Sequence, residues 1–113
     1  MHEMSLAEGV LQLVEETARR ENAKRVGIIV LEIGTLSSVE PDALKFCFES
    51  VAQGTIAQGA VLDILAVQGA GWCVQCAETV PMQERYSACP KCGRYQLQVT
   101  GGTEMRVKEI EVE

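Results

Sequence analysis

The feature that most constrains this 113-residue chain is a pair of Cys-x-x-Cys motifs separated by twelve residues. A two-residue gap lets the backbone turn so that both thiolates of one motif face the same ion, and two such turns complete a tetrahedral four-sulfur shell. Gly93 directly follows the second motif and suits the positive φ that such turns often require. The spacing is typical of a structural zinc ribbon, whose ligands are expected to be Cys73, Cys76, Cys89 and Cys92.

Two other cysteine chemistries fit this pattern less well, and a third uses the same ligands. A redox dithiol uses one Cys-x-x-Cys motif on a βαβ frame, whereas this sequence has two motifs and no such frame. Disulfides imply an oxidising compartment, but no apolar signal segment opens the sequence and its cysteines number five, an odd count. A mononuclear iron site of the rubredoxin type uses the same four thiolates, so the spacing does not exclude iron, although zinc is the expected ion.

The composition narrows the class of protein. Hydrophobic residues make up 47% of the chain and charged residues 23%, which indicates a folded chain rather than a disordered one. Ten basic residues face sixteen acidic ones, and this balance argues against a nucleic-acid partner, which needs a basic surface. No apolar run approaches the roughly 20 residues that span a bilayer, so we expect a cytoplasmic protein without a membrane partner.

Apolar periodicity predicts two helices. The first is expected over residues 5–22, after the capping-box pair Ser5 and Glu8. The second is expected to begin at Pro41, with negative charge from its neighbours at the positive helix end, and to stop near Gly54. The expected apolar face of the first helix comprises Leu6, Val10, Leu13, Val14 and Ala18. That of the second comprises Leu44, Phe48 and Val51, and the fifth cysteine, Cys47, is expected to fill the core beside them.

Short β-branched runs predict the strands. Residues 26–33 and 60–67 are almost wholly apolar, as strands covered on one or both faces would be. Residues 105–113 form a last strand, which most economically rejoins that sheet because an isolated apolar strand would stay unpaired. Within the ribbon, short strands are expected at Thr79-Val80, at Arg85-Tyr86 and over residues 96–99.

These elements predict an α+β fold, in which two helices pack on a three-stranded sheet and a four-cysteine zinc-ribbon module is inserted. Glycines at 69, 71, 101 and 102 mark breaks on both sides of the ribbon. We therefore expect an α+β domain over residues 1–68, completed by the strand within residues 103–113, and a zinc-ribbon domain over residues 69–102.

The second candidate metal site is the N-terminus. His2 is the chain's one histidine, and its position alone favours an incidental role. A free α-amine at Met1, the amide nitrogen of His2 and its imidazole can nevertheless close adjacent chelate rings on one ion, and such near-planar nitrogen sets favour Ni(II) or Cu(II) over Zn(II). Glu3 can add its amide nitrogen or its carboxylate.

Three features together resemble the HypA/HybF family of nickel metallochaperones for [NiFe]-hydrogenase maturation. They are Met1-His2-Glu3 ahead of a helix, the Gly34-centred turn into Glu40, and the double Cys-x-x-Cys before a C-terminal strand. The resemblance implies that Met1, His2 and Glu3 bind Ni(II), with Glu40 as an added ligand in some members, and that the four cysteines bind structural Zn(II). It also implies a nickel-handling GTPase and the hydrogenase large-subunit precursor as partners, with urease maturation as a further role in some members.

The function expected from these features is nickel delivery rather than catalysis. A closed four-thiolate site has no open position for substrate, and the sequence shows no nucleophile–base pair or phosphate-binding loop. The alternative is a zinc-ribbon protein-interaction module with no nickel role, and either a monomer or a homodimer fits. Some family members have histidines flanking the cysteine pairs, but Ala77 and Gly93 stand there in this chain, so a histidine-based pH switch at the zinc site is not expected.

Overall fold

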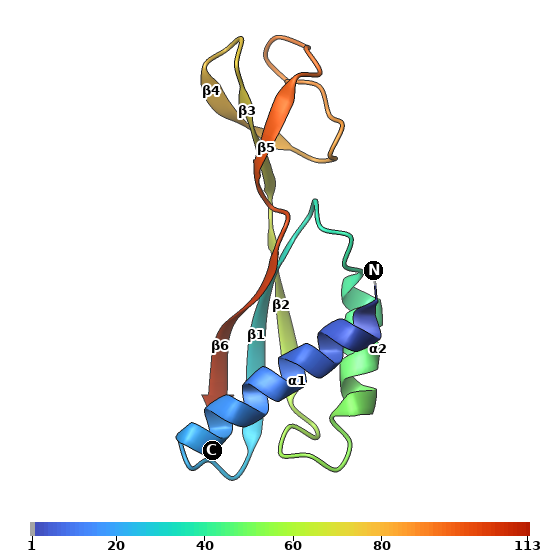
Figure 1. Ribbon diagram of the computed structural model, residues 1–113, viewed down its shortest axis with the longest axis vertical. Coiled ribbons are helices and arrows are strands. Elements are labelled where there is room, and N and C mark those ends of the chain that lie inside the picture. The colour runs from blue at the N-terminus through green and yellow to red at the C-terminus, as the bar shows by residue number, and fades with distance from the viewer. Residues whose placement is uncertain (1) are drawn as a thin grey trace. The chain divides into compact units, whose positions relative to one another are not determined.

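The computed structural model describes residues 2–113, and its contacts divide the chain into two compact units (Figure 1). The helical unit comprises the chain through Leu31, Val39–Leu65 and Arg106–Glu113, and the ribbon unit comprises Glu32–Ser38 and Ala66–Met105. The elements, in chain order, are α1 (Glu3–Arg20), β1 (Val26–Gly34), α2 (Pro41–Val51), β2 (Val61–Val67), β3 (Gly69–Cys73), β4 (Glu78–Met82), β5 (Leu97–Gly101) and β6 (Met105–Val112).

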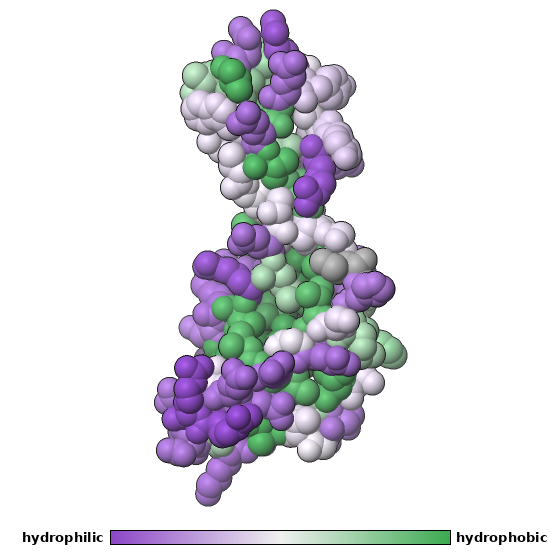
Figure 2. All heavy atoms as spheres, viewed as in Figure 1, coloured by the Kyte–Doolittle hydropathy of each residue, from purple (hydrophilic) through white to green (hydrophobic). Residues whose placement is uncertain are grey.

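Helix α1 begins two residues earlier than the sequence predicts. His2 is its N-cap residue, and the His2 carbonyl accepts the first intrahelical hydrogen bond from the Leu6 N–H at 3.1 Å. Ser5 therefore lies inside the first turn, and the predicted capping box at Ser5 is wrong. Glu3 contributes negative charge to the first turn, where the helix dipole favours it. The buried face comprises Ala7, Val10, Val14 and Ala18, and Figure 2 shows hydrophilic residues gathered along the outer side of this helix.

Helix α2 begins at Pro41, as predicted. Its N-cap residue Glu40 accepts a hydrogen bond from the Asp42 N–H at 3.1 Å through its carboxylate. Leu44 and Phe48 are buried, and the helix packs on α1. The helix ends at Val51, and the following turn contains Gly54 in the left-handed region at φ 77°.

The three-stranded sheet has the order β2-β1-β6, which confirms the expectation that the C-terminal strand rejoins the sheet. The central strand β1 is the most buried, with Ile29 and Leu31 fully covered. Figure 1 shows α1 crossing these strands within the helical unit. The α+β fold with two helices, a three-stranded sheet and an inserted four-cysteine module is therefore confirmed.

The ribbon unit contains a second antiparallel sheet of order β4-β3-β5. The predicted break at Gly69–Gly71 is instead the first half of β3, and both glycines lie against Met82 of β4. Arg85-Tyr86 is not a strand, because a turn closed by the Ser87 N–H on the Glu84 carbonyl at 3.1 Å occupies this place. Glu32–Ser38, which the sequence placed in the α+β domain, groups by contacts with the ribbon unit.

Three glycines allow three chain segments of the ribbon unit to meet without side chains between them. A Cβ atom on Gly34 would lie 2.0 Å from the Gly102 carbonyl oxygen, and one on Gly102 would lie 2.5 Å from the Gly69 Cα. The Leu36 N–H donates to the Gly102 carbonyl at 2.8 Å across this contact. Among the described residues, no helix combines the length and apolar character needed to cross a lipid bilayer.

Candidate metal centre

The four predicted zinc ligands lie in two backbone turns of similar form. Cys73 ends β3, and the Cys76 N–H points at the Cys73 sulfur at 3.5 Å. In the second turn, the Cys89 carbonyl accepts from the Gly93 N–H at 2.8 Å. Each motif is followed by a residue with positive φ, Ala77 at 53° and Gly93 at 77°. The first turn therefore ends with the same positive φ as the second, although alanine stands there in place of glycine.

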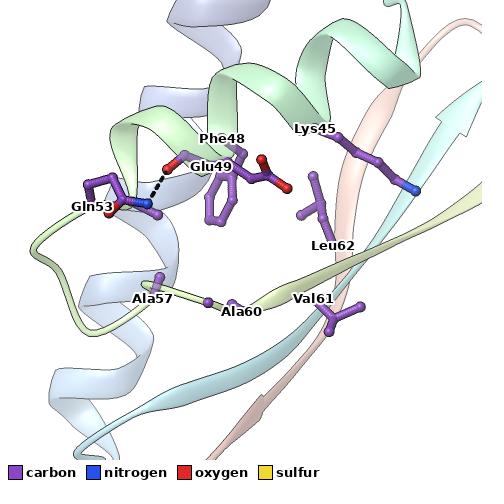
Figure 3. A pocket seen from close by; sticks show the side chains of 10 residues that line it. Lys45, Phe48, Glu49, Gln53, Ala57, Ala60, Val61 and Leu62 are labelled. Atoms are coloured by element: carbon purple, nitrogen blue, oxygen red, sulfur yellow. Dashed lines mark hydrogen bonds between the residues drawn. The ribbon is translucent and has the colours of Figure 1, made fainter.

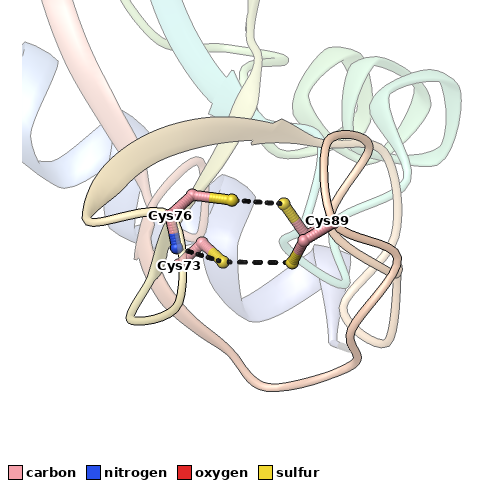
Figure 4. A group of neighbouring side chains, drawn as sticks. Cys73, Cys76 and Cys89 are labelled. Atoms are coloured by element: carbon pink, nitrogen blue, oxygen red, sulfur yellow. Dashed lines mark hydrogen bonds between the residues drawn. The ribbon is translucent and has the colours of Figure 1, made fainter.

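The sulfur positions fit a tetrahedral metal site. The Sγ atoms of Cys73 and Cys92 lie 3.7 Å apart, and those of Cys76 and Cys89 lie 3.9 Å apart (Figure 4). All four Sγ atoms lie within 4.8 Å of one another. Four thiolates at about 2.3 Å from a central zinc would be separated by about 3.8 Å. The donor set and its spacing therefore match a four-thiolate zinc or iron shell, and no disulfide links these cysteines.

The surroundings of the cysteine cluster shift the pKa values of two of its thiols in opposite directions. The backbone N–H of Cys92 lowers the pKa of Cys89 to about 7, whereas desolvation raises the pKa of Cys76 to about 12. Lys91, which lies in the second cysteine turn, forms an ion pair with Glu78, the first residue of β4. The Glu78 carboxylate raises the pKa of Lys91, so a positive charge remains next to a cluster that becomes anionic when it binds metal. Sequence reasoning missed this pair, because its members stand thirteen residues apart in unrelated motifs.

The site is closed as well as compact. Cys73 and Cys89 are buried and, with Val80, form the core of the ribbon unit, against which Cys76 and Leu97 pack. In the part of the chain that the structure describes, these cysteines are the one cluster of three or more side-chain ligands of the His, Cys, Asp or Glu type. A four-ligand site within a small core stabilises structure and has no open coordination position for catalysis.

The second candidate site lies at the start of α1. The exposed side chain of His2 belongs to the N-cap residue, and Met1 lies outside the described residues. The first four N–H groups of a helix have no intrahelical acceptor, and here these belong to the residues from His2 to Ser5. The amide nitrogens of His2 and Glu3 are therefore not committed to the helix ladder.

The helical unit brings Glu3 and Glu40 together, although thirty-seven residues separate them in sequence. The Glu40 N–H donates to the Glu3 carboxylate at 3.3 Å, so the first turn of α1 contacts the N-terminus of α2. The Glu40 carboxylate caps α2 through the Asp42 N–H. Both predicted acidic residues thus lie beside the His2 end of α1, and each has a defined hydrogen-bonding role.

A cavity of about 450 Å³ lies elsewhere in the helical unit, between α2 and the edge strand β2 (Figure 3). Phe48 and Leu62 line its apolar part, while Lys45, Glu49 and Gln53 supply polar groups from the helix. The Gln53 amide donates to the Glu49 carbonyl at 3.2 Å along that helix. Of the predicted metal-binding residues that the structure describes, none lines this cavity.

The sequence is similar to known proteins of one family. A family model described as "Hydrogenase/urease nickel incorporation, metallochaperone, hypA" matches residues 1–112. The hydrogenase maturation factor HypA of Dechloromonas aromatica (strain RCB) is 76% identical over 113 residues, covering 100% of both chains. The protein of the same name in Albidiferax ferrireducens is 62% identical, again over 100% of both chains.

Two solved structures share the fold. The solution structure of the Ni metallochaperone HypA from Helicobacter pylori matches with a TM-score of 0.70 and 27% identity, covering 99% of this chain and 97% of that chain. A second solution structure, of a HypA protein, matches with a TM-score of 0.74 and 28% identity, covering 100% of this chain and 97% of that chain. With sequence, fold and the four-cysteine site in agreement, the chain belongs to the HypA family of nickel metallochaperones for hydrogenase maturation.

Proposed function

We propose that this protein binds Ni(II) at its N-terminus, through the Met1 amine, the His2 amide and imidazole, and Glu3, and hands the ion on during [NiFe]-hydrogenase maturation. The observation that supports this most is the position of His2. Its exposed imidazole stands at the N-cap of α1, next to backbone amides that the helix ladder does not use. Nitrogen donors in a near-planar array suit Ni(II).

The exposure of this site suits a delivery protein. A chaperone must release its ion to a recipient, so its ligands have to be accessible to competing groups. His2 is exposed, whereas the four-cysteine site has two buried ligands and a complete shell. We therefore assign Ni(II) as cargo to the N-terminus and Zn(II) as the resident structural ion to Cys73, Cys76, Cys89 and Cys92.

Glu40 differs from the other proposed nickel ligands, because its carboxylate already caps α2. Glu40 lies next to the proposed nickel site because its backbone N–H donates to the Glu3 carboxylate. We propose that Glu40 holds the start of α2 against Glu3 and supplies a carboxylate oxygen when nickel is bound. Glu40→Gln keeps the hydrogen-bonding oxygen and removes the charge, so weaker nickel binding with unchanged helix content would support the ligand role, and unchanged nickel affinity would oppose it.

The free α-amine gives a direct test of the terminal site. An N-terminal extension converts the amine to an amide and displaces it from the chelate, so nickel affinity measured by titration calorimetry should fall well below that of the untagged protein. A matched C-terminal extension should leave the affinity unchanged. Equal nickel affinity with either extension would contradict ligation by the Met1 amine.

The proposed recipients and partners are the hydrogenase large-subunit precursor and a nickel-handling GTPase, and the family description extends the role to urease. We propose that the chain acts without catalysing a covalent reaction. We also propose that residues 69–102 fold as a separate zinc-ribbon domain beside an α+β domain of residues 1–68 and 103–113. A single cooperative unfolding transition of both units on zinc chelation would contradict that separation.

A further inference from the structure

A second cavity lies in the ribbon unit, and none of the four cysteines of the metal site lines it. It has a volume of about 380 Å³ and is lined by Arg85, Tyr86, Tyr95, Leu97 and Val99. Its two aromatic residues are the chain's only tyrosines. They are 89% and 77% exposed, although they border an apolar floor. Nothing in the metal chemistry uses these side chains.

The cavity follows the free edge of the ribbon sheet. The strand order β4-β3-β5 leaves β5 at an edge of this sheet as the structure describes it, with backbone groups directed outward. Leu97 and Val99 are two residues apart and pair with Cys73 and Gly71 on β3, so both face the side of the sheet that carries the metal core. An added strand would place alternate side chains on this same face, above the cavity.

The two tyrosines that line this cavity lie outside the buried core of the ribbon unit. Its buried members are Cys73, Val80 and Cys89, and neither tyrosine packs among them. Tyrosine and arginine are the residues that protein interfaces favour, because they combine a large apolar area with hydrogen-bonding groups. The cavity thus has the composition of an interface centre.

Charge indicates what kind of partner fits. The Arg85 Nε–H donates to the Leu36 carbonyl at 3.0 Å, which holds the guanidinium at the cavity and leaves its other donors directed elsewhere. A carboxylate is the natural partner for this fixed guanidinium.

We propose that β5 and the cavity between Tyr86 and Tyr95 dock an extended, carboxylate-bearing segment of a partner protein by strand addition. One apolar side chain of that segment enters the cavity, a carboxylate two residues away on the same face of the strand pairs with Arg85, and the segment's backbone pairs with β5. This docking does not depend on nickel, so it holds whether or not His2 is a nickel ligand.

The test is an NMR titration of the zinc-loaded, ¹⁵N-labelled full chain with a capped seven-residue peptide that has valine at its centre, glutamate two residues to either side of it and threonine at the other positions. Two control peptides replace glutamate with lysine or replace the central valine with proline. The glutamate peptide should shift the amides of β5 and of Tyr86, while the lysine and proline peptides should leave them in place, because one lacks the carboxylate and the other lacks a strand N–H. Absence of shifts at millimolar glutamate peptide, or equal shifts with all three peptides, would overturn the proposal.

Variants locate the site. Tyr86→Ala and Arg85→Gln should each weaken binding at least about tenfold, the scale of an interface hot spot. Phe46→Ala, which removes a 74% exposed aromatic ring from α2 in the helical unit, is the matched control and should leave the affinity unchanged. Zinc content of every variant confirms that the ribbon is intact, and Tyr95→Ala replaces any variant that loses zinc. If Phe46→Ala weakens binding as much as the ribbon variants, the peptide binds elsewhere and the proposal is wrong.

Discussion

Replacing Gly102 with alanine tests the close contact among the three glycine-bearing segments of the ribbon unit. Gly102 has φ 81°, in the left-handed region that alanine adopts at a cost of about 1–2 kcal/mol. Its new Cβ atom would also lie 2.5 Å from the Gly69 Cα and 2.8 Å from the Gly69 nitrogen. Both are backbone atoms, so the neighbouring strand rather than a flexible side chain has to move.

Forcing a methyl group into such a contact adds about 1–3 kcal/mol to the conformational cost. We therefore expect Gly102→Ala to lower the free energy of unfolding of the ribbon unit by about 2–5 kcal/mol. Gly93→Ala is the matched control in the same unit, because Gly93 has φ 77° and no atom lies within 4 Å of the place that its new methyl group would take. It should cost only the conformational part, about 1–2 kcal/mol.

The assay is urea unfolding of the zinc-loaded protein, with zinc content verified for each variant. Fluorescence of Trp72, the chain's one tryptophan, reports the ribbon unit because it lies in β3, and far-ultraviolet circular dichroism reports α1 and α2. Gly59→Ala, also with open space and φ 81° but in the helical unit, should change the circular dichroism transition instead. The reasoning is refuted if Gly102→Ala costs no more than Gly93→Ala.

Two further changes probe the metal centre. Ala77→Gly should stabilise the zinc-loaded ribbon by about 1 kcal/mol in the same urea assay, because Ala77 has φ 53°, and a destabilised variant would contradict this. Cys76→Ser should lose zinc and the dispersed NMR signals of the ribbon while the helical signals remain, and full zinc retention by mass spectrometry would count against the site.

The metal centre was predictable from sequence because its chemistry dictates its spacing. Two Cys-x-x-Cys motifs bring four thiolates together wherever the intervening strands pair, and the structure places all four sulfurs within 4.8 Å of one another. The helices and the first sheet were predictable for the same kind of reason, since apolar periodicity reports which face is buried. Pro41 determines the start of α2 in the same local way.

Features that depend on distant neighbours could not be predicted. The start of α1 at Glu3 has no strong local signal, and the capping-box pattern places the N-cap residue at Ser5, three residues after the observed N-cap residue His2. Ala77 adopts positive φ only because the metal turn requires it, and alanine gives no hint of that. The contact of Gly34 with Gly102, and that of Glu3 with Glu40, joins segments far apart in the chain that no local pattern connects.

The central claim is that nickel binds at the N-terminus rather than at the cysteine site. It is tested most directly by titrating Ni(II) into the untagged, zinc-loaded chain and into its His2→Ala variant, with metal analysis and absorption spectra of both. The account predicts stoichiometric nickel binding beside retained zinc in the unaltered protein, and loss of that nickel, with zinc and helix content unchanged, in the variant. Equal nickel affinity of the two proteins, or nickel uptake only with loss of zinc, would contradict it.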